Sequence, residues 1–227
     1  MTRTLLIIVF FIPCSLVVNA QFKKNDILLG GQLSYTYNSS SSYEPSGYYT
    51  ASDQKMNYGN ITVSLGKAVN ENTLIGIDLS YLPSSSTNAV TNGTPAFKYQ
   101  NNGYAVGIFF RKYKSLGKEF FLFGQGSASY GWSDQTGKDS AGKKIASGSS
   151  WNAGIDLFPG IAYRISKHFF LELSIPDLFV VRYTKGHSTN QYDINDTQTS
   201  KNDQLLISSS LSTNPLTDLG IGFRLIL

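Results

Sequence analysis

Residues 151–165 read Trp-Asn-Ala-Gly-Ile-Asp-Leu-Phe-Pro-Gly-Ile-Ala-Tyr-Arg-Ile, with an apolar residue at every odd-numbered position. The even-numbered positions are small, polar or charged, with Phe158 as the exception. Alternation with a period of two is typical of a β-strand whose two faces meet different surroundings. The last residues, Leu219–Leu227, repeat the pattern with leucine, isoleucine or phenylalanine at every second position. We therefore expect strands with two unlike faces.

Eight stretches alternate in this way, and no window of ten residues keeps a helical period. The predicted fold class is therefore all-β. Because a proline cannot donate to a strand ladder, Asn214-Pro215 predicts a bulge or bend that leaves Thr217–Leu227 as the final strand. The eight stretches are Ile27–Asn38, Met56–Asn70, Thr73–Leu82, Lys98–Tyr113, Glu119–Trp132, Ser149–Ser166, His168–Tyr183 and Gln204–Leu227.

The connections between these stretches alternate between long polar segments and tight turns. Transmembrane β-barrels have this asymmetry, with short periplasmic turns and longer outer loops. The sequence therefore predicts an eight-stranded antiparallel up-and-down transmembrane β-barrel with four long outer loops and three short periplasmic turns. The long segments are Ser39–Lys55, Pro83–Phe97, Ser133–Gly148 and Thr184–Asp203, and the turns lie at Asn70–Asn72, Ser115–Lys118 and Ser166-Lys167.

The composition of the second face indicates which face points inward. It carries glycine, alanine, serine and isolated charges, which suit the narrow interior of an eight-stranded barrel. A solvated face would carry many lysines and glutamates. The apolar face is therefore expected to contact lipid, with aromatic residues at the ends of the strands forming interfacial girdles. These aromatic residues are Tyr35, Tyr37, Tyr81, Tyr113, Trp132, Trp151 and Tyr183.

Charged residues make up only 15% of the 227 residues, whereas soluble domains have about a quarter. This deficit argues against an ordinary soluble enzyme. A helical membrane protein is excluded as well, because it would need several apolar runs of about 20 residues. The formal net charge is +4, and no basic cluster is long enough to suggest binding to nucleic acid.

The first residues, Met1–Ala20, have the charged start, apolar centre and small-residue end of a secretory signal peptide. Cleavage is expected before Gln21, which leaves residues 21–227 as a single barrel domain. The only cysteine, Cys14, lies inside the signal peptide. The mature chain is therefore expected to form no disulfide and to use no thiolate.

The chain resembles the small outer-membrane β-barrel proteins of Gram-negative bacteria, of the OmpA/OmpX type and particularly those typical of the Bacteroidetes. The resemblance rests on the signal peptide, the eight strands with four long loops, and the alternating final strand. It implies a location in the outer membrane and insertion by the barrel-assembly machinery. The family usually ends in phenylalanine, whereas this chain ends in leucine. The implied assembly signal comprises Leu219, Ile221, Phe223, Leu225 and Leu227.

Six charged residues are expected to point into the lumen, and three of them are acids and three are arginines. Buried charges persist only when they are paired, so this balance favours a closed salt-bridge plug over a conducting pore. Four of them are expected in one layer near the short turns, with the two aspartates deeper. Arg164→Gln is therefore expected to lower the melting temperature by several degrees. The six residues are Asp78, Arg111, Asp156, Arg164, Glu172 and Arg224.

The sequence predicts a non-enzymatic structural, envelope or surface-interaction role through the outer loops. The protein is expected to be a monomer in contact with outer-membrane lipids and lipopolysaccharide. No cofactor is expected and no metal either, because the two histidines lie far apart in the predicted topology. Three alternatives stay open: a narrow porin-like channel for small solutes, a lipid-A-modifying enzyme that uses His187, and a secreted lipocalin-like binder.

Overall fold

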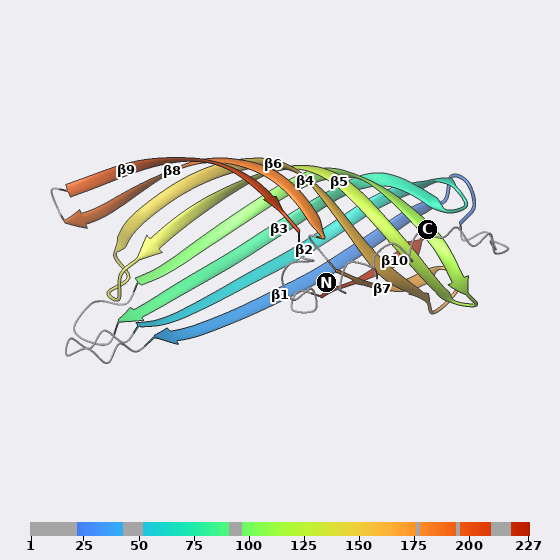
Figure 1. Ribbon diagram of the computed structural model, residues 1–227, viewed down its shortest axis with the longest axis horizontal. Helices are drawn as coiled ribbons and strands as arrows, with labels where there is room; N and C mark the ends of the chain where they lie inside the picture. The colour runs from blue at the N-terminus through green and yellow to red at the C-terminus, as the bar shows by residue number, and fades with distance from the viewer. Residues whose placement is uncertain (1–21, 43–51, 91–96, 176–177, 194–195, 210–218) are drawn as a thin grey trace, which may run out of the picture.

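The computed structural model describes residues 22–42, 52–90, 97–175, 178–193, 196–209 and 219–227, so the predicted signal peptide lies outside it. In this part of the chain, no helix is long and apolar enough to span a bilayer. The strands form one antiparallel sheet (Figure 1), which confirms the all-β fold. They are β1 (Ile27–Ser42), β2 (Ser52–Asn70), β3 (Thr73–Val90), β4 (Phe97–Gly117), β5 (Phe120–Lys138), β6 (Lys144–Arg164), β7 (Phe169–Ser174), β8 (Phe179–Asp193), β9 (Asp196–Ser208) and β10 (Gly220–Ile226).

The sheet closes on itself, because the last strand pairs with the first. β10 runs antiparallel to β1 over Leu28–Leu33, and the Leu227 amide donates to the Ile27 carbonyl at 2.9 Å. β10 also pairs with β7, β7 with β6, and β6 with β5. Eight strands therefore form a ring in the order β1-β2-β3-β4-β5-β6-β7-β10, as the sequence predicts.

The stretch His168–Tyr183, expected as one strand, is divided into β7 and β8, which lie end to end beside β6. β7 pairs with Gly160–Arg164, and β8 pairs with Ala146–Leu157. Between these two segments, the carbonyl of Pro159 accepts a hydrogen bond from the Ile175 amide at 3.1 Å. Proline has no N–H to donate in return. The ladder therefore loses a bond at this place. A second proline, Pro176, lies in the stretch itself, between Ser174, where β7 ends, and Phe179, where β8 begins.

The last predicted stretch, Gln204–Leu227, is also divided. β9 pairs with β8, whereas β10 pairs with β7 and β1. The predicted bend at Asn214-Pro215 lies outside the described residues. The final strand, β10, lies within the predicted Thr217–Leu227.

The expectation of four long outer loops is wrong, because most of those residues belong to strands. β1 and β2 stay paired as far as Ser42 and Ser52, and β5 and β6 as far as Lys138 and Lys144. Beyond the membrane both faces of a strand meet polar surroundings, so the alternation of residue types disappears although the ladder continues. The outer ends are therefore extended hairpins. Short connections at the opposite end comprise residues 71–72, 118–119 and 165–168.

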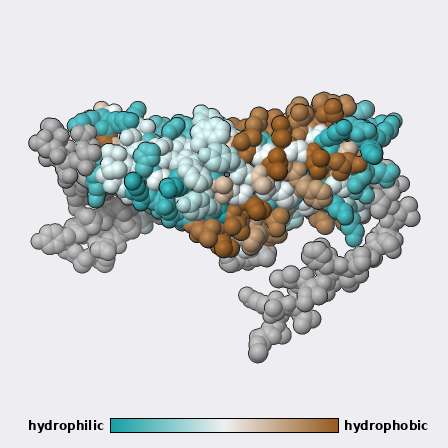
Figure 2. All heavy atoms as spheres, turned by 90° about the horizontal axis from the view of Figure 1, so that it is seen from above, coloured by the Kyte–Doolittle hydropathy of each residue, from teal (hydrophilic) through white to brown (hydrophobic). Residues whose placement is uncertain are grey.

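An apolar belt crosses the face of the barrel seen in Figure 2, nearer the end with the short turns, with polar surface on both sides of it. Exposed large apolar residues occur on every strand from β1 to β10. Outward side chains in the belt include Ile77, Ile108 and Ile155, which are 47, 65 and 54% exposed. On β5 the usual rise and tilt of a barrel strand place Trp132 about 30 Å above Phe120 along the barrel axis. This distance matches the thickness of membrane hydrocarbon.

Aromatic side chains form a row at the outer edge of the belt, as in the interfacial girdles of membrane barrels. Neighbouring rings in this row have centroids between 5.3 and 6.0 Å apart. Tyr113 was expected in a girdle, and this is wrong, because its side chain is 3% exposed and lies in the lumen on the same face of β4 as Arg111. The aromatic row comprises Tyr81, Tyr104, Tyr130, Trp132, Trp151 and Tyr183.

Inside the barrel, large side chains lie over glycines of neighbouring strands. Phe109 of β4 points inward beside Gly76 of β3, which pairs with Gly66 of β2. A Cβ at Gly76 would lie 2.6 Å from the Phe109 ring and would collide with the carbonyl oxygen of Leu65. The two glycines therefore provide the space that the aromatic ring fills.

Gly76→Ala is expected to destabilise the barrel by about 1–3 kcal/mol, the usual cost of overpacking a filled interior. Gly124→Ala is the matched control, because nothing lies within 4 Å of a Cβ at this outward position. The measurement is the urea midpoint, followed by the difference in electrophoretic mobility between unheated and boiled samples. Equal midpoints for the two variants would contradict the close packing of Phe109 on Gly76.

Candidate functional site in the barrel lumen

A buried carboxylate lies between two arginines at the short-turn end of the lumen. Glu172 of β7 accepts two hydrogen bonds from Nη1 of Arg111, at 2.7 and 2.6 Å, and one from Nε of Arg224 at 3.1 Å. The Tyr113 hydroxyl donates to the same carboxylate at 3.0 Å. The side chains of Arg111, Glu172 and Arg224 are only 2, 7 and 3% exposed. The carboxylate is therefore compensated by the arginines and not by solvent, and the three ions together keep one positive charge.

Aromatic rings and a glycine hold the two guanidinium groups in place. Cζ of Arg111 lies 4.2 Å from the centroid of Phe123, and Cζ of Arg224 lies 5.6 Å from the centroid of Phe109. A cation over an aromatic face is favourable, more so when it is desolvated. Gly30 pairs with Arg224 across the β1–β10 ladder, and a Cβ there would lie 3.1 Å from the guanidinium. The glycine leaves the space that the arginine occupies.

The segment before β1 folds into the same end of the barrel. The ring of Phe22 is 3% exposed and lies 5.2 Å from Tyr113 and 5.8 Å from Phe170. Its amide donates to the carbonyl of Glu71 in the β2–β3 turn at 3.2 Å. Together these side chains form one buried cluster at this end of the lumen, and we call them the plug. The plug comprises Phe22, Arg111, Tyr113, Phe121, Phe123, Phe170, Glu172 and Arg224.

Gln125 of β5 connects the plug to Asp78 of β3. Its Oε1 accepts from Nε of Arg111 at 2.7 Å, and its Nε2 donates to Asp78 at 3.3 Å and to Ser127 at 3.0 Å. Asp78 thus joins the cluster through an amide rather than through a direct ion pair. Two arginines and two acids then balance in charge across this part of the lumen.

Two of the six predicted lumen charges, Arg164 and Asp156, form ion pairs outside the Glu172 cluster, although Cζ of Arg164 lies 5.4 Å from the centroid of Phe121 in the plug. Arg164 stands opposite Phe170, at the same level as Arg224, but the expectation that it joins the charge network around Glu172 is wrong, because it bonds to Glu119 of the β4–β5 turn at 2.6 Å. The side chains of this pair are 27 and 46% exposed, so the pair lies at the solvated rim. Asp156 pairs instead with Arg182 of β8 at 3.2 Å.

Several contributors to these contacts were missed by sequence reasoning. Tyr113 and Arg182 stand at inward positions of their strands, so alternation along β4 and β8 could have identified both. Glu119 lies in a turn, where alternation does not apply. Phe22 precedes the first strand, and no pattern in the sequence indicates that it enters the lumen.

Toward the outer end, the lumen contains a polar chamber of about 370 Å³. Its walls come from β3, β4, β5, β6, β8 and β9. His187 is the one ionisable residue in its lining, but its ring is exposed on the same face of β8 as Tyr183, with the ring nitrogens 3.4 Å from the Ser149 hydroxyl. The rest of the lining is rich in hydroxyl and amide side chains, which can form hydrogen bonds with neutral polar ligands. These lining residues include Ser84, Asn101, Ser133, Gln135, Thr184 and Asn202.

The C-terminal residues predicted as an assembly signal lie on and beside the strand that closes the ring. Ile221, Phe223 and Leu225 stand at outward positions of β10, and the Phe223 ring stacks 6.1 Å from that of Phe169. Leu219 and Leu227 flank the strand and are exposed. Recognition of these residues by the assembly machinery stays a prediction.

The residues that the structure describes contain no cluster of three His, Cys, Asp or Glu side chains able to hold a metal ion. No known family model matches the chain, and no curated protein matches it either.

Several solved structures are similar to this chain at low identity. They include the siderophore receptor PiuA from Acinetobacter baumannii, with 10% identity, a TM-score of 0.42, and coverage of 82% of this chain and 46% of the receptor. The translocator domain of the autotransporter NalP from Neisseria meningitidis has 11% identity, a TM-score of 0.45, and coverage of 91% and 90%. The outer membrane protein OprG from Pseudomonas aeruginosa has 15% identity, a TM-score of 0.45, and coverage of 92% and 99%. The chain spans about half the length of the siderophore receptor.

The class of this protein follows from its own architecture. The closed ring leaves no strand edge unpaired in lipid, and the apolar belt with its aromatic row has the height of a bilayer. These features define an integral membrane β-barrel. Barrels with an even number of antiparallel strands and short turns at one end are built into bacterial outer membranes. The chain is a small outer-membrane β-barrel protein.

Glu172→Gln is expected to destabilise the barrel by about 3–5 kcal/mol, because it leaves the buried charges of Arg111 and Arg224 without a counter-ion. Arg164→Gln, in contrast, breaks a partly solvated pair and is expected to cost less than about 1 kcal/mol. This small cost replaces the loss of several degrees in melting temperature that the sequence alone predicts for Arg164→Gln. Urea midpoints of the two variants against the wild type test the difference. A Glu172→Gln barrel as stable as the Arg164→Gln barrel would contradict the assignment of Glu172 to the plug.

Proposed function

We propose that this protein is a non-conducting, non-enzymatic outer-membrane barrel with a structural and surface-interaction role, carried by the polar hairpins outside the membrane. The observation that supports this proposal best is the plug. It joins an ion cluster to five aromatic rings at the end of the barrel with the short turns.

The plug disfavours conduction because its residues are nearly inaccessible to water. A water-filled pore exposes the side chains that line it, whereas Phe22, Arg111, Tyr113 and Arg224 are each at most 3% exposed. An eight-stranded barrel is also just wide enough for side chains to fill. A solute channel would require the plug to leave the lumen, and this would separate Glu172 from both arginines.

The outer part of the barrel supports a role at the cell surface. Paired strands continue about 15–25 Å beyond the aromatic row, judged from the usual rise and tilt of barrel strands. Their continuous ladders hold the hairpins at fixed positions, and the polar chamber between them is lined by hydroxyl and amide groups. We propose that this polar extension contacts neighbouring surface molecules, including lipopolysaccharide, while the barrel-assembly machinery inserts the monomer through β10.

Planar-bilayer recordings test the closed lumen. The wild-type barrel is expected to give no stepwise conductance under conditions in which a 16-stranded porin conducts. The double variant Phe22→Ala, Phe170→Ala is expected to conduct, because removal of two rings opens a path through the aromatic part of the plug. Tyr183→Ala, which removes an outward ring of similar size, is the control and is expected to stay silent. Steps from the wild type equal to those from the double variant would favour a solute channel instead.

A further inference from the structure

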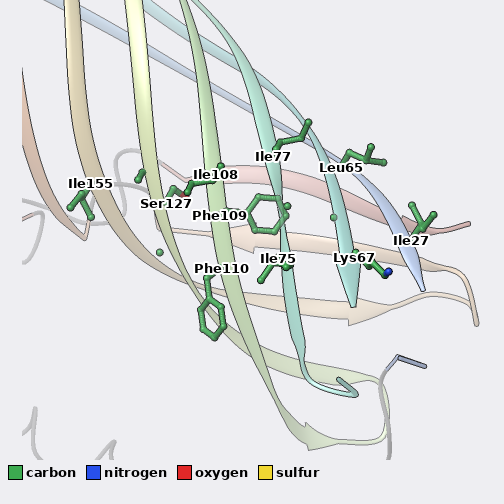
Figure 3. A pocket seen from close by; sticks show the side chains of 14 residues that line it. Ile27, Leu65, Lys67, Ile75, Ile77, Ile108, Phe109, Phe110, Ser127 and Ile155 are labelled. Carbon is green, nitrogen blue, oxygen red and sulfur yellow. The ribbon is translucent and has the colours of Figure 1, made fainter. Parts of the chain in front are cut away.

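The membrane-facing wall of the barrel contains a broad hollow of about 840 Å³ (Figure 3). It lies in the apolar belt and extends over the outward side of strands from β1 to β6. Lys67 is the one charged residue in its lining. The large apolar residues around the hollow include Leu65, Ile75, Ile77, Ile108, Phe110 and Ile155.

Small outward residues on β5 account for part of this hollow. Gly126 lies between Phe110 of β4 and Leu157 of β6, and Ala128 occupies the next outward position of the same strand. Cδ2 of Leu157 leans over Gly126, 3.1 Å from the position of a Cβ, whereas Ala128 presents only an exposed methyl group. In a bilayer this space must be filled by an apolar group, because water in hydrocarbon would lose its hydrogen bonds. The acyl chains of a lipid have the required shape and chemistry.

The end of the hollow nearest the short turns is positively charged. Lys67 is exposed on β2, three residues before the strand ends at Asn70, and it pairs with Ile75 in the β2–β3 ladder. Lys112 is exposed on β4, two residues beyond Phe110 toward the same end. Neither ammonium belongs to an ion pair within the described part of the chain. Lysines at the edge of a membrane direct their ammonium groups to the headgroup region, where lipid phosphates lie.

We propose that this hollow is a binding site for an anionic glycerophospholipid of the periplasmic leaflet. The acyl chains lie in the hollow against Gly126, Ala128 and the apolar side chains around them, and the phosphate contacts Lys67 and Lys112. The apolar hollow binds the acyl chains, and the two lysines favour a lipid whose headgroup is negatively charged. The site lies on the lipid-facing side of the barrel and does not involve the plug in the lumen.

Native mass spectrometry of the purified full-length barrel tests this site. The barrel is delipidated in detergent and then offered an equal mixture of phosphatidylglycerol and phosphatidylethanolamine. The wild type is expected to retain phosphatidylglycerol in preference. Each lysine near a membrane surface contributes about a fivefold preference for anionic lipid, so Lys67→Gln and Lys112→Gln are each expected to reduce the preference by about that factor. Cardiolipin in place of phosphatidylglycerol shows whether one phosphate or two are bound.

Lys167→Gln is the matched control, because Lys167 is exposed in the β6–β7 turn and does not line the hollow. Ala128→Phe, which fills the hollow, is expected to lower retention of both lipids while the unheated band in electrophoresis shows a folded barrel. The proposal fails if Lys67→Gln and Lys167→Gln retain the same ratio of lipids. It also fails if the delipidated wild type forms a dimer that Ala128→Phe abolishes, because a second copy would then occupy the hollow.

Discussion

The backbone pairing of β10 with β1 is the constraint on which the rest of the structure depends. An unpaired amide or carbonyl costs several kcal/mol in hydrocarbon, so a sheet of this kind is stable in a membrane only as a closed ring. The ladder over Leu28–Leu33, with the bond from Leu227 to Ile27, joins the first strand to the last at the short-turn end. Once the ring is closed, each strand residue within the membrane faces either lipid or the lumen.

The limited width of the ring then determines what the lumen contains. Eight strands leave space for side chains and little more, so some large inward residues are accommodated by a glycine across the ladder. Phe109 opposite Gly76 and Arg224 opposite Gly30 show this complementarity. A charge in such a lumen has almost no water to solvate it. Glu172 is therefore bonded to two arginines and to a tyrosine hydroxyl, and the same contacts fill this end of the barrel.

The sequence predicts the ring and its two faces well, because lipid on one side and a narrow lumen on the other impose a period of two on residue type. It predicts the outer hairpins poorly, because Ser39–Ser42 is paired strand in which both faces are polar. To predict which side chains touch, one must know the register of neighbouring strands, and the alternation along a single strand does not give that register. Arg164 shows this limit, since its partner Glu119 lies in a turn. The break between β7 and β8 could have been expected, because Pro176 lies inside the predicted stretch His168–Tyr183 and a proline cannot donate to a strand ladder.

The shortage of charged residues follows from the same two environments. A charge within the membrane-spanning part of the barrel needs a partner, and the available partner depends on where the charge lies. In the lumen it is an opposite charge, as for Glu172 between Arg111 and Arg224. At the rim it is water together with an exposed counter-ion, as for Arg164. On the lipid-facing side of the barrel neither is present within the hydrocarbon, so a lysine such as Lys67 is placed at the edge of the belt, where its ammonium group can reach the headgroup region.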